Sequence, residues 1–142
     1  MVTLVASAPQ NVTHPHSPYT FVANVETYNA PLNLTVVYPS FTHPTPLQLN
    51  VKNNNGNTNL VLDENYQGTF SAQNQLNTVN VQPVAVPSSS DPMNLGRSRL
   101  VEYELVSPTF SRGWAGWGSP MQGVIESQVK ISSSLSPVVL QL

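Results

Sequence analysis

The 142-residue sequence contains no cysteine, and this absence removes several kinds of chemistry at once. Disulfide bonds, thiolate nucleophiles and zinc or iron-sulfur sites held by cysteine are all excluded. A chain of this length can still bury most of its apolar surface without covalent staples. We therefore expect a single domain over residues 1–142 that folds on its own core and holds no cofactor.

Charge is also scarce. Only 8% of the residues are charged and the formal net charge is -2, whereas about 25% is usual. Five lysine and arginine residues in the whole chain are too few to neutralise a run of phosphates, so we expect no nucleic-acid partner. No apolar stretch approaches the roughly 18 residues of a membrane-spanning helix, so we expect no membrane insertion.

The sequence shows no secretory leader. The apolar segment 1–8 lacks basic residues, and Pro9 follows too early for the core of a signal peptide. This pattern is compatible with a cytoplasmic location and with an extracellular location reached by a non-standard route.

Almost every apolar run in the chain alternates with polar residues. A period of two is typical of strands with one buried face, and proline interrupts the chain at 13 places. The pattern predicts an all-β domain of about ten short strands. The residues expected to be buried are Leu34, Leu49, Val51, Leu60, Leu62, Phe70, Val79, Val81, Tyr103, Ile131 and Leu140.

A short polar pattern with a small or turn-forming residue returns four times, each time before an alternating apolar run. The copies align on Ala30, Gly56, Leu76 and Ser136. Most of the spacing fits a period near 20 residues, which favours stacked supersecondary units. The sequence thus predicts a β-solenoid-like stack of strand units of about 20 residues, with a two-sheet antiparallel β-sandwich as the alternative. An irregular surface loop is expected near residues 83–96, where proline and serine gather.

The strongest candidate for recognition is the glycine-rich run at residues 112–118. Trp114 and Trp117 could offer flat apolar faces to sugar rings, and Arg112 could donate hydrogen bonds. The alternative is that the two indoles cover the open end of the core. Arg112, Trp114 and Trp117 are therefore the predicted ligand-binding residues.

Other chemistry is weakly indicated. His14, His16 and His43 could form a metal site, since His14 and His16 would point to the same side of an extended strand. Pro15 lies between these two and no carboxylate lies nearby in the sequence, so no metal site is predicted. Glu102 and Glu104 share one face of a predicted strand at about 7 Å, near the spacing of a glycosidase pair. The alternation that makes this face polar also leaves the carboxyl groups in solvent, so we expect no catalytic residue.

Four blocks of the sequence, residues 29–34, 60–70, 113–118 and 134–140, resemble a domain of unknown function common in mushroom-forming fungi. That family is similar in pattern to adhesin-like domains. The resemblance implies an all-β, repeat-built domain without known catalytic residues.

With the resemblance, the expected function is that of a non-catalytic, adhesin-like surface, matrix or interaction module of a fungus rather than an enzyme. The alternative is a carbohydrate-binding protein, a lectin, that uses Trp114 and Trp117, and the least favoured interpretation is a glycoside hydrolase. The expected partner is a glycan, another protein or a second copy of the chain through exposed sheet edges.

Overall fold

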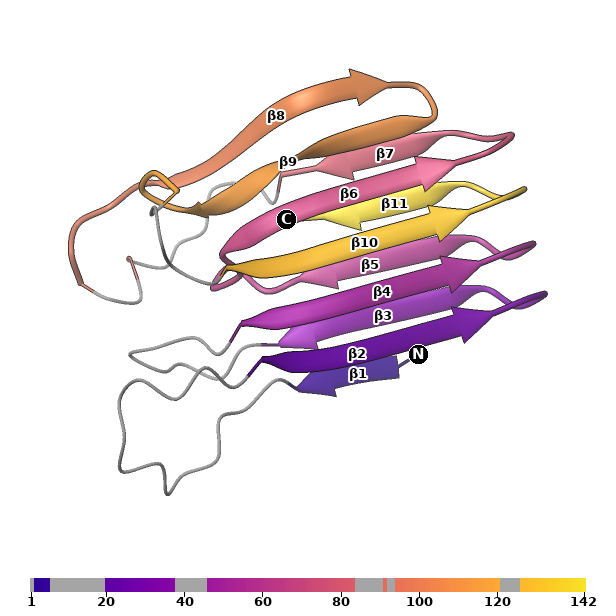
Figure 1. Ribbon diagram of the computed structural model, residues 1–142, viewed down its shortest axis with the longest axis horizontal. Coiled ribbons are helices and arrows are strands. Elements are labelled where there is room, and N and C mark those ends of the chain that lie inside the picture. Colours follow the sequence, from indigo (N-terminus) through magenta and orange to yellow (C-terminus); the bar gives the residue numbers. More distant parts are fainter. Residues whose placement is uncertain (1, 6–19, 38–45, 84–90, 92–93, 121–125) are drawn as a thin grey trace.

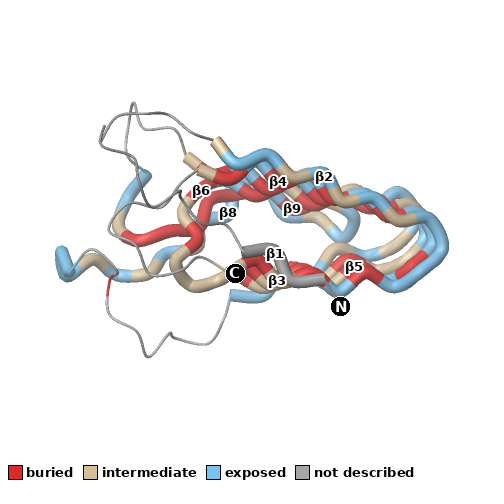
Figure 2. Tube along the Cα trace, turned by 90° about the horizontal axis from the view of Figure 1, so that it is seen from below, coloured by how far each residue is buried: buried red, intermediate tan, exposed pale blue. Residues whose placement is uncertain are grey.

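The computed structural model describes residues 2–5, 20–37, 46–83, 91, 94–120 and 126–142. The all-β class predicted from the sequence is confirmed, because every regular element in these ranges is a strand and the strands form two facing sheets (Figures 1 and 2). Among the described residues no helix is long and apolar enough to cross a membrane. The strands are β1 (Val2–Val5), β2 (Phe21–Thr27), β3 (Leu32–Val37), β4 (Leu47–Asn53), β5 (Thr58–Leu62), β6 (Gly68–Asn74), β7 (Val79–Gln82), β8 (Arg99–Ser107), β9 (Phe110–Trp117), β10 (Ser127–Ser133) and β11 (Val138–Gln141).

The chain passes back and forth between the two sheets. Sheet A has the order β1-β3-β5-β11-β7 and is parallel throughout, whereas sheet B has the order β2-β4-β10-β6-β9-β8. Sheet B is parallel from β2 to β6 and then antiparallel through β9 and β8. A sheet B strand, a short turn and the next sheet A strand together form what we call an arch, and the described residues form four: β2–β3, β4–β5, β6–β7 and β10–β11.

The last arch does not lie at the end of the stack. The C-terminal β10–β11 arch lies between β4–β5 and β6–β7 in both sheets, where its yellow strands separate the magenta ones in Figure 1. Strands distant in sequence therefore become neighbours, because β10 pairs with β4 on one side and with β6 on the other.

The core fills the space between the two sheets. Strict alternation in β4 buries every second residue, and the buried residues of both sheets face each other across the layer (Figure 2). Eight predicted core residues are confirmed as buried: Leu34, Leu49, Val51, Leu60, Leu62, Phe70, Ile131 and Leu140. Val79 and Val81 in β7 are only partly buried against this cluster.

The prediction for Tyr103 was wrong, since 43% of this residue is exposed. Its strand, β8, is the edge of sheet B, so among the described residues no further strand covers its outer side. The Tyr103 ring still meets the buried ring of Phe70 edge-on, with 6.0 Å between the centroids.

Buried polar side chains form hydrogen bonds in the turns of three of the four arches. Asn53, the last residue of β4, is 1% exposed. Its Nδ2 donates to the carbonyl oxygen of Gly56 at 2.7 Å in its own turn and to that of Ala30 at 3.2 Å in the neighbouring turn. Its Oδ1 accepts a hydrogen bond from the Gly56 amide at 3.3 Å. Asn74 and Ser133 occupy the same place in their arches and are also buried.

The register of the strands corrects the alignment of the four turns. Sheet A strands begin two residues after Ala30, Gly56 and Ser136, and β7 begins two residues after Asn77. Asn77, rather than Leu76, therefore matches the other three positions. Leu76 instead lies at the tip of its turn with 75% of its surface exposed.

Candidate functional site

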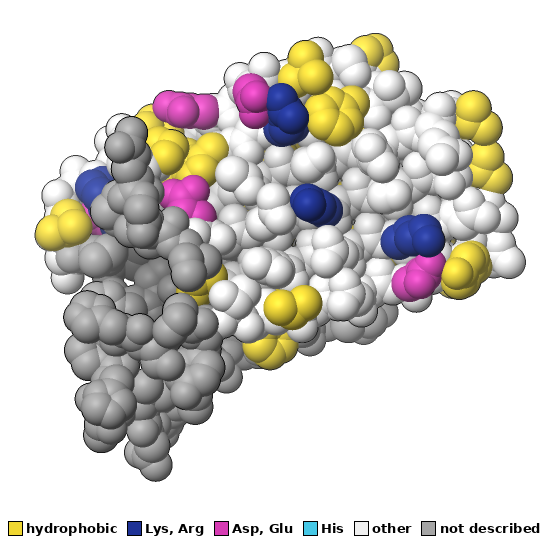
Figure 3. All heavy atoms as spheres, viewed as in Figure 1, with side chains coloured by type: hydrophobic (Ala, Val, Ile, Leu, Met, Phe, Trp, Pro, Cys, Tyr) yellow, Lys and Arg dark blue, Asp and Glu magenta, His cyan; other side chains and the backbone are white. Residues whose placement is uncertain are grey.

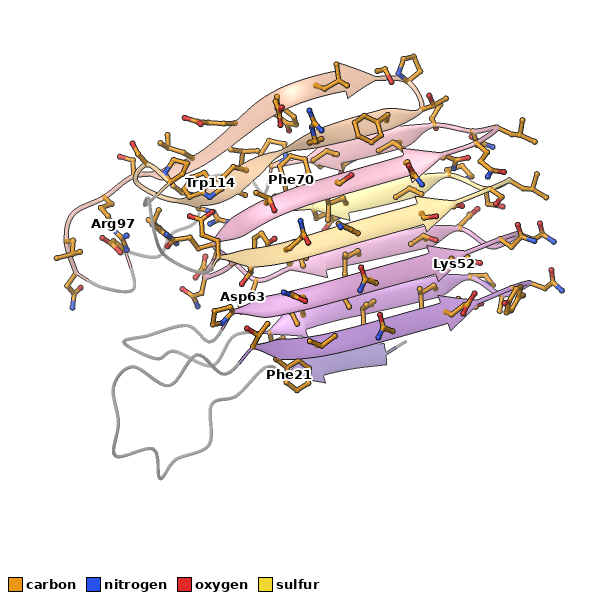
Figure 4. All side chains as sticks on the ribbon, in the orientation of Figure 1. Phe21, Lys52, Asp63, Phe70, Arg97 and Trp114 are labelled. Atoms are coloured by element: carbon orange, nitrogen blue, oxygen red, sulfur yellow. The ribbon has the colours of Figure 1, made fainter. Side chains whose placement is uncertain are left out.

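The three predicted ligand-binding residues all belong to β9, but they lie in different surroundings. Arg112 and Trp114 lie on the outer face of sheet B. Ala115 points to the inner face, and Trp117, two residues further along the strand, lies on the same inner face. Figure 4 shows Trp114 near one end of this strand.

Trp114 is on the outer face and is nevertheless only 6% exposed. Its Nε1 donates to Glu126 Oε2 at 2.9 Å. The ring lies against Gly116, where a Cβ on the glycine would come within 2.4 Å of the indole, so the missing side chain leaves the space that the ring occupies. The indole is thus packed into the protein and does not offer an open face to a ligand in this structure.

Trp117 is 4% exposed, and its Nε1 donates to the carbonyl oxygen of Glu64 at 2.9 Å. It lies opposite Arg99 in the ladder between β8 and β9. Both indoles are therefore buried rather than open to solvent, Trp114 on the outer face of sheet B and Trp117 on the inner face. Their glycine-rich context allows close packing here rather than exposure.

Arg99 was missed by the sequence reasoning. Burial lowers the pKa of its guanidinium, although the neighbouring Tyr66, Glu64 and Asp63 act in the opposite direction. Its Nη1 donates to the carbonyl oxygen of Tyr66, whereas its Nη2 has no hydrogen-bond partner among the described residues. A single arginine at the start of a strand gives no sequence signal that it will be partly buried.

Just before β8, the buried Asp91 forms an ion pair with Arg97, which is half-buried. Arg97 Nε donates to Asp91 Oδ2 at 2.9 Å and its Nη2 donates to Asp91 Oδ1 at 2.8 Å. The hydrogen bonds to Asp91 are the main cause of the raised pKa of Arg97, and the negative charge of Asp91 acts in the same direction. The pair lies at the end of the loop predicted near residues 83–96, most of which falls outside the described residues.

Arg112 is exposed and pairs with a carboxylate of the next strand. Its Nη2 donates to Glu104 Oε1 at 2.6 Å. A β-bulge in β8 brings Glu104 to this position, because the ladder shifts register between Tyr103 and Leu105. Glu102 lies opposite the outward Trp114, so Glu102 and Glu104 both lie on the outer face of sheet B.

Beside this ion pair the outer face of sheet B is hollowed by a shallow depression with a volume of about 290 Å³. Its walls come from β6, β8, β9 and β10. The polar side chains around it are Thr69, Ser71, Glu104, Arg112, Gln128 and Lys130. They include hydrogen-bond donors, acceptors and both signs of charge, so the depression can bind a polar group from several sides.

The strand register explains how these side chains meet. Lys130, Ser71 and Arg112 form one row across β10, β6 and β9. Gln128 and Thr69 are neighbours in the next outward row. The alternation of the sequence predicts that these residues point outward, but it could not show that β10 lies beside β6.

The rest of this face is polar and sparsely charged (Figure 3). Asn50 Nδ2 donates to Asn24 Oδ1 at 3.0 Å, which continues the polar surface from β4 to β2. Lys52 pairs with Glu26 at 3.1 Å near the far end of the face. No ion pair is seen for Lys130 among the described residues, which leaves its ammonium group available beside the depression.

The histidines considered as metal ligands, His14, His16 and His43, lie outside the described residues. Within the described ranges, no three histidine, aspartate or glutamate side chains come close enough together to hold a metal ion.

Comparison with protein-family models, with curated proteins and with solved structures gives no match. The resemblance to a fungal domain family therefore stays a prediction, and function has to be argued from the surface itself.

Proposed function

We propose that the protein is a non-catalytic, adhesin-like interaction module that recognises its ligand on the outer face of sheet B. The observation that carries this proposal is the polar depression between Lys130 and the Arg112–Glu104 pair. Its side chains are held by four neighbouring strands, so a ligand meets groups whose backbone positions are already fixed.

The ligand class that best suits this surface is a glycan. Sugar hydroxyl groups both donate and accept hydrogen bonds. The depression offers Ser71 between two cations, and Gln128 and Thr69 in the next row. This retains the lectin alternative from the sequence but moves its site. The buried indoles of Trp114 and Trp117 position β9, while Arg112 belongs to the binding surface.

A hydrolase fits this face less well. The Glu104 carboxylate is bound to Arg112 and its side chain is 65% exposed. A general acid needs a proton held in place near neutral pH, which calls for burial rather than an exposed ion pair.

The proposal includes an architecture, a β-solenoid-like stack of arches. It is supported by the strand pairing: neighbouring arches pair through parallel strands in both sheets, and their turns lie at matching positions. The β10–β11 arch is inserted into this stack. In such a stack each outward row runs across several arches, and this produces the long polar face.

A glycan array that includes fungal wall polysaccharides tests the proposed function. We expect saturable binding by the wild-type protein and about tenfold weaker binding by Lys130→Ala and by Arg112→Ala, since a hydrogen bond to a charged group is worth about 1.5–3 kcal/mol. Lys52→Ala is the matched control, because it removes the same charge from the same face away from the depression. It should bind like the wild type. A folded wild-type protein that binds no glycan would reject the ligand class, and equal binding by all three variants would reject the site.

A further inference from the structure

We infer that copies of this chain associate end to end, with the β8 edge of one copy lying parallel to the β2 edge of the next. These strands are the two outer edges of sheet B, and within the described part of the chain neither has a partner on its outer side. An unpaired edge offers a row of amide and carbonyl groups to another strand. This association is independent of glycan binding.

Strand direction favours a head-to-tail contact. β9 is antiparallel to β6, and β8 is antiparallel to β9, so β8 runs in the same direction as β2. A second copy stacked on the first without being turned over therefore brings β8 and β2 together as parallel neighbours. Parallel pairing also joins β2, β4, β10 and β6 within sheet B.

The register of the rows brings apolar residues together on the inner side of this contact. Each inward row of paired residues in sheet B runs from β2 to β8, and in the proposed contact it continues into β2 of the next copy. The residues that would then become neighbours are incompletely buried in a single copy. Phe21 is 38% exposed, Tyr103 is 43% exposed and Val106 is 63% exposed. Phe21 is seen at the lower edge of the stacked strands in Figure 4. The inner pairs are Phe21 with Val101, Ala23 with Tyr103, and Val25 with Val106.

The two sheets do not end at the same level. Sheet A continues by one strand, β1, beyond the β2–β3 arch, and sheet B continues by two strands, β9 and β8, beyond the β6–β7 arch. In the head-to-tail arrangement β1 of one copy faces the overhanging strands of the other. A two-fold β2–β2 contact would instead bring β1 to the place that the partner copy needs for its own β3.

Charge opposes the other two-fold contact. Pairing β8 with β8 of a second copy would bring the exposed carboxylates of Glu102 and Glu104 toward those of the partner copy. In the head-to-tail register Glu102 lies instead beside Val22, which is 56% exposed. The head-to-tail contact therefore avoids both the steric and the electrostatic conflict. Because such a contact does not close on itself, it allows open chains of copies.

Light scattering and sedimentation over a concentration series of the full-length chain test this inference. We expect the mean mass of the wild-type protein to rise with concentration. Val22→Glu should weaken the association constant about tenfold, because it brings like charges together across the contact. Adding Glu102→Lys to that variant should restore association, since the same pair then attracts.

Gln48→Glu is the matched control. Gln48 is an exposed neighbour of Val22 in the same row, but it lies one strand inside the edge. It adds the same charge and should leave association unchanged. A wild-type protein that stays monomeric throughout the series would overturn the inference, and so would a closed dimer that is insensitive to Val22→Glu.

Discussion

Replacing Asn53 by alanine tests the claim that buried polar side chains hold the arches together. The side chain is 1% exposed and makes three hydrogen bonds, to the Gly56 carbonyl, the Gly56 amide and the Ala30 carbonyl. At about 1 kcal/mol net for each bond, Asn53→Ala should lower the free energy of unfolding by about 3 kcal/mol. For a domain of this size that corresponds to a fall in Tm of roughly 6–12 °C.

Two further variants sharpen this prediction. Asn50→Ala removes one exposed hydrogen bond on the same strand and should cost less than about 0.5 kcal/mol. Asn53→Ser should fall between the two, because Ser133 at the same place in its own arch bonds the Ser136 carbonyl at 3.0 Å. We expect it to cost about 1–2 kcal/mol.

The assay is equilibrium unfolding in urea, followed by the fluorescence of the buried Trp114 and Trp117. Equal slopes against urea would show that the variants unfold from equally compact states. The reasoning would be refuted if Asn53→Ala cost no more than Asn50→Ala, since the turn would then not depend on its buried amide.

Three other predictions concern packing and charge. Gly113→Ala should cost about 2–3 kcal/mol in urea unfolding, because its Cβ would come within 2.0 Å of a backbone carbonyl oxygen. Gly96→Ala has open space and only a strained φ of 67°, so it should cost about 1 kcal/mol, and a reversed order would contradict the packing. The hydrogen bond from Lys52, followed by that from Tyr28, holds the pKa of Glu26 below its ordinary value of 4.5. Lys52→Gln should therefore raise this pKa in an NMR titration. The stabilisation from the pair should be present above pH 4.5 and be lost as the pH falls through the lowered pKa. An unchanged pKa would contradict this pairing. Trp117→Phe should cost about 1 kcal/mol of stability through one lost hydrogen bond and leave glycan binding unchanged, whereas a loss of binding without a loss of stability would restore the indole platform.

The alternation of apolar residues was enough to predict the all-β class, and most of the residues predicted to be buried are buried. The prediction was correct for Leu49 and Ile131, because their strands, β4 and β10, have neighbouring strands on both sides. The same rule failed for Tyr103, since a period of two identifies the inward face of a strand but does not reveal whether the strand is at an edge.

The surroundings of the predicted site residues could not be predicted from the sequence either. Arg112 lies on the proposed binding surface, but Trp114 and Trp117 are buried by contacts with residues outside their own glycine-rich run, Glu126 and Glu64. Local composition suggested exposed rings because glycine is common in flexible segments. In the fold, Gly113 and Gly116 are positions where backbone or indole approaches too closely for a Cβ.

The depression could not be predicted, because it depends on the order of strands. β10 follows β6 by about fifty residues along the chain, yet it forms one wall of the same hollow. Nothing in the alternating pattern of β10 distinguishes insertion between β4 and β6 from addition at the end of the stack. The turn patterns indicated that the arches are related but left their order open.

The most direct test of this account is therefore the position of β10, and the absence of native cysteine makes it simple. Asn50 and Lys130 are partners in adjacent strands on the outer face, whereas Asn50 and Ser71 are separated by β10. Two strand spacings amount to about 10 Å, beyond the roughly 7 Å between Cα atoms that a disulfide can span. Under mild oxidation we predict that the Asn50→Cys/Lys130→Cys protein forms an intramolecular disulfide and that the Asn50→Cys/Ser71→Cys protein does not. The opposite result would place β6 directly beside β4 and would remove the depression on which the proposed function rests.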